Sequence, residues 1–379
     1  MRVMGEETGE GFYLTGKGGN GTPVSYSLTR DMLMFHGFEL LYGPGAREES
    51  ARMTAVCEEL FRAGVGGRFA IVAPTHRFAL RLAERFVEKN REQWIAPQIF
   101  GLNEFVMLLL PEISRERILS ARESLWIMRR IAWADPGAFA VFFSDAGRLF
   151  PRRIERAASL VLKMKQEGRA PADLSRIVLT DKQKKALAIL FDRYNKFLKA
   201  NERYDEADIM RMASEAKLDD KIRQIFPEIE MLIIDGVDRF SQILIRLLRN
   251  LAEAVPRTIV LLEFEENRPL IFHHMERSFL ALKQASGQTR RIEAEAPQTW
   301  KQGVLSSFLE DKSGITDDGA GFSIEARTAP DFTGEVRYIA RRVKTLLLDK
   351  DRMILPGDVC VCFPSLDEYG PMAERSEER

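Results

Sequence analysis

Short apolar runs alternate with amphipathic helical patterns in two parts of the chain, and this alternation constrains the fold most strongly. In the first part, the runs 37–43 and 67–75 are each followed by a helical pattern. In the second part, the runs 231–234 and 257–264 flank another helical pattern. Strands that alternate with helices predict a parallel sheet with helices on its faces. We therefore expect an α/β fold.

The middle of the chain breaks this alternation. From about residue 114 to residue 220, nearly every segment has a helical period and no strand pattern interrupts it. One apolar stripe at helical spacing consists of Ile154, Ala157, Leu160, Val161 and Met164. Such spacing is typical of helices that bury one face. We expect a large all-helical insertion within the α/β domain.

Both ends of the chain differ from the rest. The first residues are rich in Gly, Thr and Ser, which predicts a disordered leader. Near the other end, a helical pattern precedes the apolar run 358–364. Two strands alone make a marginal sheet, so this part either extends the first sheet or begins a second domain that continues beyond the chain. We favour the second domain, and expect the chain to be a fragment.

These patterns predict five segments. They are a leader (1–29), the first half of domain 1 (30–113), the helical insertion (114–220), the second half of domain 1 (221–322) and the start of domain 2 (323–379).

Charge and cysteine content narrow the possible environments. The 56 basic and 56 acidic residues balance, so any surface for nucleic acid depends on local clustering. Three cysteines argue against a disulfide framework and fit a reducing compartment. No apolar run reaches the roughly 18 residues that a membrane span needs. We expect a cytoplasmic protein without membrane contact.

A strand, a glycine turn and a helix follow one another in ELLYGPGAREES. A phosphate-binding P-loop has this order, with a lysine for the phosphates and a hydroxyl for magnesium. Gly43, Gly45 and Ser50 fit the pattern. Glu48 and Glu49, however, occupy the glycine and lysine positions, where a carboxylate repels phosphates. We expect a degenerate site that does not use ATP or magnesium. The alternative is an ordinary turn whose glutamates complement the helix dipole.

Asp235 directly follows the buried run 231–234. In P-loop ATPases an acidic residue at such a strand end holds magnesium, and in helicases a following glutamate orients the attacking water. Here Gly236 follows, so the magnesium ligand type is kept and the catalytic base type is lost. An Asp-Gly strand end is also common elsewhere. We group it with the glycine turn in one degenerate nucleotide site, formed by Gly43, Gly45, Glu49, Ser50 and Asp235.

Two groups of polar residues are candidates for DNA contact. Thr75, His76 and Arg77 follow a predicted strand, at the sheet edge where α/β folds bind ligands. The run PRRIERAASLVLKMKQEGR also brings many cations to one helical pattern, as phosphate contacts require. Its alternative is a solvated helix face. The candidates in this run are Arg152, Arg153 and Arg156.

No metal site is expected. Asp208, Glu215 and Lys217 imitate the spacing of a nuclease core, but they lie in a helical pattern where carboxylates do not converge on a metal. Cys360 and Cys362 have no second pair at zinc-like spacing.

Seven stretches follow one another over nearly all of the chain after Thr29. They are ELLYGPGAREES, FAIVAPTHRFALRLAERF, IFGLNEFVMLLL, VLKMKQEGRAPADL, RYDEADIM, EMLIIDGVDRFSQIL and APDFTGEVRYIARRVKTLLLDKDRMILPGDVCVCFPSLDEYGPMAER. In order and spacing they resemble the N-terminal part of an AddB-type protein, the B subunit of bacterial helicase–nuclease complexes. The resemblance implies a RecA-like P-loop NTPase fold of the UvrD-type helicase superfamily 1, with a helical insertion and the start of a second RecA-like domain.

The same resemblance implies a function. In such subunits the helicase-like part is frequently a scaffold that grips DNA beside an AddA-type motor subunit. The family also has a C-terminal PD-(D/E)XK nuclease domain, often with an iron–sulfur cluster, which we expect only beyond this chain. We expect the DNA-binding scaffold portion of a double-strand-break repair complex, without a cofactor of its own.

Two other functions stay open, and with them the question of enzymatic activity. The chain could still bind ATP weakly as a helicase domain, or it could be a protein-interaction fragment left by gene decay. Magnesium-dependent binding of an ATP analogue would indicate the first, and absence of DNA binding the second.

Overall fold

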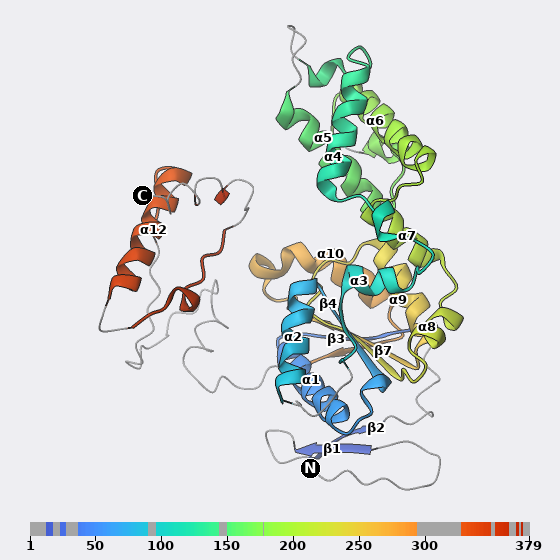
Figure 1. Ribbon diagram of the computed structural model, residues 1–379, viewed down its shortest axis with the longest axis vertical. Coiled ribbons are helices and arrows are strands. Elements are labelled where there is room, and N and C mark those ends of the chain that lie inside the picture. The colour runs from blue at the N-terminus through green and yellow to red at the C-terminus, as the bar shows by residue number, and fades with distance from the viewer. Residues whose placement is uncertain are drawn as a thin grey trace. The chain divides into compact units, whose positions relative to one another are not determined.

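The protein is represented by a computed structural model that separates into two compact units (Figure 1). The described residues are 13–17, 23–27, 37–89, 96–143, 150–176, 178–293, 327–349, 353–363, 369–370 and 373. Residues 37–293 lie in the first unit, and the described residues from 327 onward lie in the second.

A six-stranded sheet forms the centre of the first unit, and all its strands are parallel. Their order is β5-β4-β6-β7-β3-β8, so one strand, β7, separates β3 from β6. The structure therefore confirms the α/β fold with a parallel sheet. The strands are β3 (Glu39–Tyr42), β4 (Phe69–Ala73), β5 (Ile99–Gly101), β6 (Met231–Ile234), β7 (Arg257–Leu262) and β8 (Gln288–Arg291).

The inner strands are the continuous apolar runs of the sequence. Every residue of β4 and β6 is buried, as expected for strands covered on both faces. The edge strand β8 is different, because all four residues of its sequence QTRR are exposed. Sequence analysis did not predict this strand, which depends on its pairing with β3 from the far end of the domain.

Helices cover both faces of the sheet (Figure 1). On one face, α1 and α2 pack against Leu41, Ile71 and Ile233. On the other face, α3, α7, α8, α9 and α10 pack against the alternate residues, such as Leu40 and Val72. These helices are α1 (Ala46–Arg62), α2 (His76–Lys89), α3 (Leu102–Leu108), α7 (Glu206–Glu215), α8 (Asp219–Ile225), α9 (Gln242–Ala254) and α10 (Pro269–Ala285).

Three further helices form a cluster with its own apolar core (Figure 1). They are α4 (Ala121–Ala134), α5 (Pro151–Gln166) and α6 (Asp181–Ala200). Capping boxes start α4 at Ser120 and α6 at Thr180, where each hydroxyl accepts an amide hydrogen bond from three residues later. Among the described residues of 114–220 no extended strand occurs, as predicted. The separate cluster is shorter than predicted, however, because α7 and α8 belong to the sheet core.

The described parts of the leader depart from our prediction of disorder. Strands β1 (Tyr13–Lys17) and β2 (Pro23–Ser27) pair antiparallel, with Lys17 opposite Pro23. The sequence between them contains Asn20-Gly21, and Asn-Gly is a strong hairpin signal that our prediction did not weigh.

The second unit contains one long helix, α12 (Phe332–Leu348). The Asp331 carboxylate accepts the Gly334 amide at 2.6 Å and caps this helix. Tyr369 donates a hydrogen bond to Glu335 at 2.8 Å and stacks on Phe363, with ring centroids 4.9 Å apart. The predicted strand at 358–364 is wrong for residues 359–363, which form no strand. The described part of this unit has no other strand with which they could pair.

No helix in the described part of the chain has both the length and the apolar character that crossing a membrane requires.

Candidate functional site

The glycine turn between β3 and α1 is short. The strand ends at Tyr42 and α1 already begins at Ala46, so only residues 43–45 connect them. Gly43 has a φ of +125°, which residues with a side chain rarely adopt. In the P-loop pattern the residues before the lysine position form the phosphate cradle. Here the three residues before Glu49 belong to the helix, so the open part of a cradle is missing.

The backbone that follows β8 packs over this turn. The Gly45 amide donates a hydrogen bond to the Ile292 carbonyl at 3.0 Å, and the Gly43 amide donates to the Leu262 carbonyl at 3.2 Å. A Cβ atom on Gly45 would overlap the Glu293 carbonyl oxygen. The two glycines are therefore needed for close contact between backbones, and their amides already have acceptors within the chain.

Ser50 and Asp235 meet although 185 residues separate them. The Ser50 hydroxyl lies in the second turn of α1 and donates a hydrogen bond of 2.5 Å to Oδ2 of Asp235, just after β6. Because β7 lies between β3 and β6, this bond crosses above one strand of the sheet. The structure thus brings together the hydroxyl and the carboxylate that the sequence placed in one site.

The carboxyl group of Asp235 is in a partly buried position. Burial raises its pKa, whereas the hydrogen bonds from the Ser50 hydroxyl and the Gly236 amide oppose this rise. Gly236 has a φ of +74°, and a Cβ atom there would lie 3.2 Å from the Pro74 ring. The Asp-Gly pair therefore forms a tight turn against the end of β4.

Glu49 reverses the charge that a P-loop carries at this position. Its side chain is only 7% exposed and forms ion pairs with Arg52 at 3.3 Å and with Arg290 of β8 at 3.8 Å. Arg290 also lies 3.8 Å from Glu39. The glutamate is thus a paired structural group between α1 and the edge of the sheet.

Thr75, His76 and Arg77 lie exposed at the carboxyl end of β4, as expected for the first DNA-contact candidate. The Thr75 hydroxyl accepts the Phe78 amide at 3.3 Å and caps α2. Nδ1 of His76 lies 2.6 Å from Oε1 of Glu104 at the start of α3. Burial alone raises the pKa of Glu104, but hydrogen bonds from His76 and the Gly101 amide give a net lowering. Of the three candidates, Arg77 therefore contributes its charge without a nearby acid partner in the described structure.

The second DNA-contact candidate lies in the helical cluster, away from the sheet edge. Arg152, Arg153 and Arg156 are all exposed on α5. Arg153 is partly engaged, since its Nη1 donates to the Val141 carbonyl at 3.1 Å and its guanidinium lies 4.2 Å from the Phe150 ring centroid. Arg152 and Arg156 extend from the same side of the helix, four residues apart.

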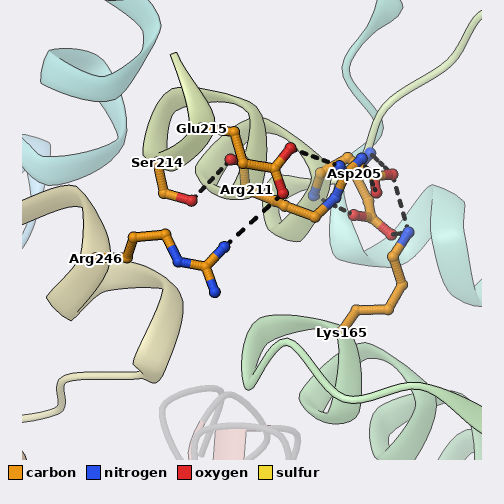
Figure 2. A network of polar contacts seen from close by, with 7 residues as sticks. Lys165, Asp205, Arg211, Ser214, Glu215 and Arg246 are labelled. Carbon is orange, nitrogen blue, oxygen red and sulfur yellow. Dashed lines mark hydrogen bonds and ion pairs between the residues drawn. The ribbon is translucent and has the colours of Figure 1, made fainter. Parts of the chain in front are cut away.

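Lys165 belongs to the same basic run but lies inside the protein. Its side chain is 7% exposed, and its Nζ lies 2.7 Å from Asp205 and 2.9 Å from Asp208 (Figure 2). It also lies 5.1 Å from the centroid of the buried Tyr194 ring. Burial and the neighbouring Asp205 raise the pKa of Asp208, whereas Lys165 lowers it. Lys165 therefore fastens α5 of the helical cluster to the start of α7.

The same network continues along α7 and excludes the nuclease-like pattern. Arg211 lies 4.0 Å from Asp208 and 3.1 Å from Glu215, and Arg246 of α9 lies 4.0 Å from Glu215 (Figure 2). Asp208 and Glu215 thus bind separate cations of the chain. Within the described ranges no group of three His, Cys, Asp or Glu side chains could hold a metal ion. The sulfur atoms of Cys360 and Cys362 lie 3.8 Å apart and are not bonded.

Sequence reasoning missed three features of these sites. The first is Arg290, whose position depends on an unpredicted edge strand. The second is Glu104, although Gly101 and Glu104 have the spacing of a helix cap, and the Gly101 amide does donate to its carboxylate at 3.1 Å. The third is a pair of exposed tryptophans on α4, Trp126 and Trp133.

No protein-family model matches the chain, and no curated protein sequence matches it. The resemblance to AddB-type subunits therefore stays a prediction.

Proposed function

We propose that this chain is a DNA-binding, helicase-like scaffold that does not turn over ATP, part of a helicase–nuclease B subunit. The observation that carries this proposal is the Ser50–Asp235 hydrogen bond. In P-loop NTPases the hydroxyl of the phosphate loop and an acidic strand-end residue hold one magnesium ion together. Here the same residue types meet above a parallel sheet, with one strand between their own strands. This arrangement supports a RecA-like domain of the superfamily 1 type.

Three features support the loss of ATP turnover. A buried, paired Glu49 occupies the lysine position. The loop before it is shortened to residues 43–45, and the Gly45 amide already donates to the backbone after β8. Gly236 occupies the position of the catalytic glutamate in helicases. A nucleotide thus lacks its cradle, its counter-charge and its catalytic base.

The DNA-binding part of the proposal depends on the exposed candidates at two places. Arg77 lies at the carboxyl edge of the sheet, next to the turn at Asp235. Arg152 and Arg156 provide further positive charge on the helical cluster. The partner in this proposal is an AddA-type motor subunit, the compartment is the cytoplasm, and the second unit begins a second RecA-like domain.

Equilibrium binding of a fluorescent ATP analogue tests the inactive nucleotide site. We expect no saturable, magnesium-dependent binding, either for the protein as it is or for the variant Glu49→Lys. The variant matters because it restores the lysine but not the open loop. Tight magnesium-dependent binding by the unaltered protein would refute the inactive-site proposal and favour a weakly active helicase domain.

Binding of a fluorescein-labelled oligothymidine tests the DNA-binding scaffold. We expect affinity to fall steeply with salt concentration, because phosphate contacts release counterions. Neutralising Arg152 and Arg156 together lowers the steepness by roughly 0.7 per lost contact in a log–log plot. Absence of binding at low salt would refute the proposal and favour a protein-interaction fragment.

A further inference from the structure

Two large aromatic side chains of α4 face solvent. Trp126 is 57% exposed and Trp133 is 63% exposed. The opposite side of the helix is well packed, with Ile127, Met128 and Ala132 buried in the cluster core. An aromatic side chain can bury 150–250 Å² in total, so two exposed tryptophans on one ordered helix leave a large apolar surface uncovered.

The tryptophans share their face of α4 with arginines. Seven residues separate Trp126 from Trp133, which is about two helical turns and places both on one side. Arg122 and Arg130 lie on the same side because they are four residues before and after Trp126. The Arg130 guanidinium lies 5.0 Å from the Trp126 ring centroid. Aromatic planes and positive charges therefore alternate along the exposed face.

The exposed face of α5 adjoins this face of α4. Arg129 of α4 and Glu155 of α5 form an ion pair, and both side chains are partly exposed at 36% and 42%. Each of these residues lies at the border between the buried and the exposed side of its helix. The outer faces of both helices thus meet along this ion pair. We call the combined area the α4–α5 surface, formed by Arg122, Trp126, Arg130, Trp133, Arg152, Arg156 and Lys163.

The charge of the α4–α5 surface selects a negatively charged partner. Its five cations are Arg122, Arg130, Arg152, Arg156 and Lys163, all exposed. Within the described part of the chain none of them forms an ion pair. The nearest carboxylate on α4, Glu123, caps the helix by accepting the Ser120 amide at 2.8 Å. The surface therefore combines uncompensated positive charge with aromatic planes.

We propose that the α4–α5 surface binds single-stranded nucleic acid, with bases stacked on Trp126 and Trp133 and phosphates beside the arginines and the lysine. At 1.5 Å per residue the two tryptophans are about 10.5 Å apart along the helix. This equals about three nucleotide steps of 3.4 Å. Bases of a single strand can stack on aromatic side chains, whereas those of a duplex are already paired and stacked. This inference rests on the proposed DNA-binding function and assigns it a place and a strand preference.

The experiment measures the affinity of the full chain for a labelled oligothymidine and for a duplex of equal length. The variants are Trp126→Ala and Trp133→Ala, with Trp126→Phe and Trp133→Phe as conservative counterparts. Phe197→Ala on α6 is the matched control, because Phe197 is also an exposed aromatic residue of the cluster, at 36%. Thermal unfolding of each variant reports whether the fold is kept, which we expect because both tryptophans are exposed.

We expect each alanine variant to bind the single strand about 5-fold to 150-fold more weakly, the range for loss of one stacked base. The phenylalanine variants and Phe197→Ala keep most of the affinity, and duplex binding changes little. If the unaltered protein binds the single strand but the alanine variants bind equally well, the assignment of this surface is wrong while the DNA-binding function stands. If the unaltered protein binds no single strand, the proposed function fails and this inference fails with it.

Discussion

Replacing Ser50 by alanine removes the hydrogen bond that joins α1 to the end of β6. The hydroxyl donates to Asp235 at 2.5 Å, and the Gly236 amide is the other hydrogen-bond donor that supports this carboxylate. A hydrogen bond to an ionised group contributes about 1.5–3 kcal/mol, compared with about 0.5–1.5 kcal/mol for a bond between neutral groups. We expect Ser50→Ala to lower the free energy of unfolding by about 1.5–3 kcal/mol at neutral pH.

This loss depends on pH through Asp235. Burial raises the folded-state pKa of Asp235, although the Ser50 and Gly236 hydrogen bonds lower it. A carboxyl whose folded-state pKa exceeds its unfolded value of about 3.9 binds more protons in the folded state between the two values. Stability therefore falls as pH rises through that interval. Removing the Ser50 hydroxyl raises the folded-state pKa further, so the variant loses most at neutral pH and least below about pH 4.

Urea unfolding followed by circular dichroism, at pH 7.5 and again near pH 4, measures this difference. Ser159→Ala is the matched control, because Ser159 is an exposed serine in α5. In the background of Asp235→Asn, the Ser50→Ala change should cost less and lose its pH dependence. An equal effect of Ser50→Ala at both pH values, or an unchanged effect beside asparagine, would refute the role given to this carboxylate.

Two further substitutions test the packing around the candidate site and inside the cluster. Gly45→Ala should cost about 1–3 kcal/mol in urea unfolding, because the added methyl group overlaps the Glu293 carbonyl oxygen, whereas Gly357→Ala meets no atom within 4 Å and should be close to neutral. Lys165→Met should cost about 3–5 kcal/mol, because it leaves two buried carboxylates without their cation, whereas the exposed Lys163→Met should change the melting temperature little.

The inner part of the sheet could be predicted from sequence because burial on both faces produces unbroken apolar runs. β4 and β6 are such strands, and both lie where the sequence indicated. β8 could not be found in this way, since its residues are polar and its pairing with β3 joins segments about 250 residues apart. The strand predicted at 358–364 fails for the opposite reason, because an apolar run forms a strand only beside a partner.

The candidate site was predictable in its members but not in its closure. The order of the motifs sufficed to group Ser50 with Asp235, which do meet. The backbone at Ile292 that occupies the Gly45 amide carries no sequence signal, because any residue offers a carbonyl group. Lys165 shows the limit of charge counting. It belongs to a basic run, but it lies on the same side of α5 as the buried Ile154 and Val161, so folding turns it inward.

The buried ion pairs of Lys165 also determine how independently the helical cluster can move. Breaking such a pair costs about 3–5 kcal/mol, so a state in which α5 separates from α7 would make up less than about 1% of the molecules. Because α7 in turn packs on the sheet core, the cluster behaves as a rigid lever and not as a tethered arm. A pull on α4 or α5 is therefore transmitted as torque to the sheet, on whose edge Ser50 and Asp235 lie.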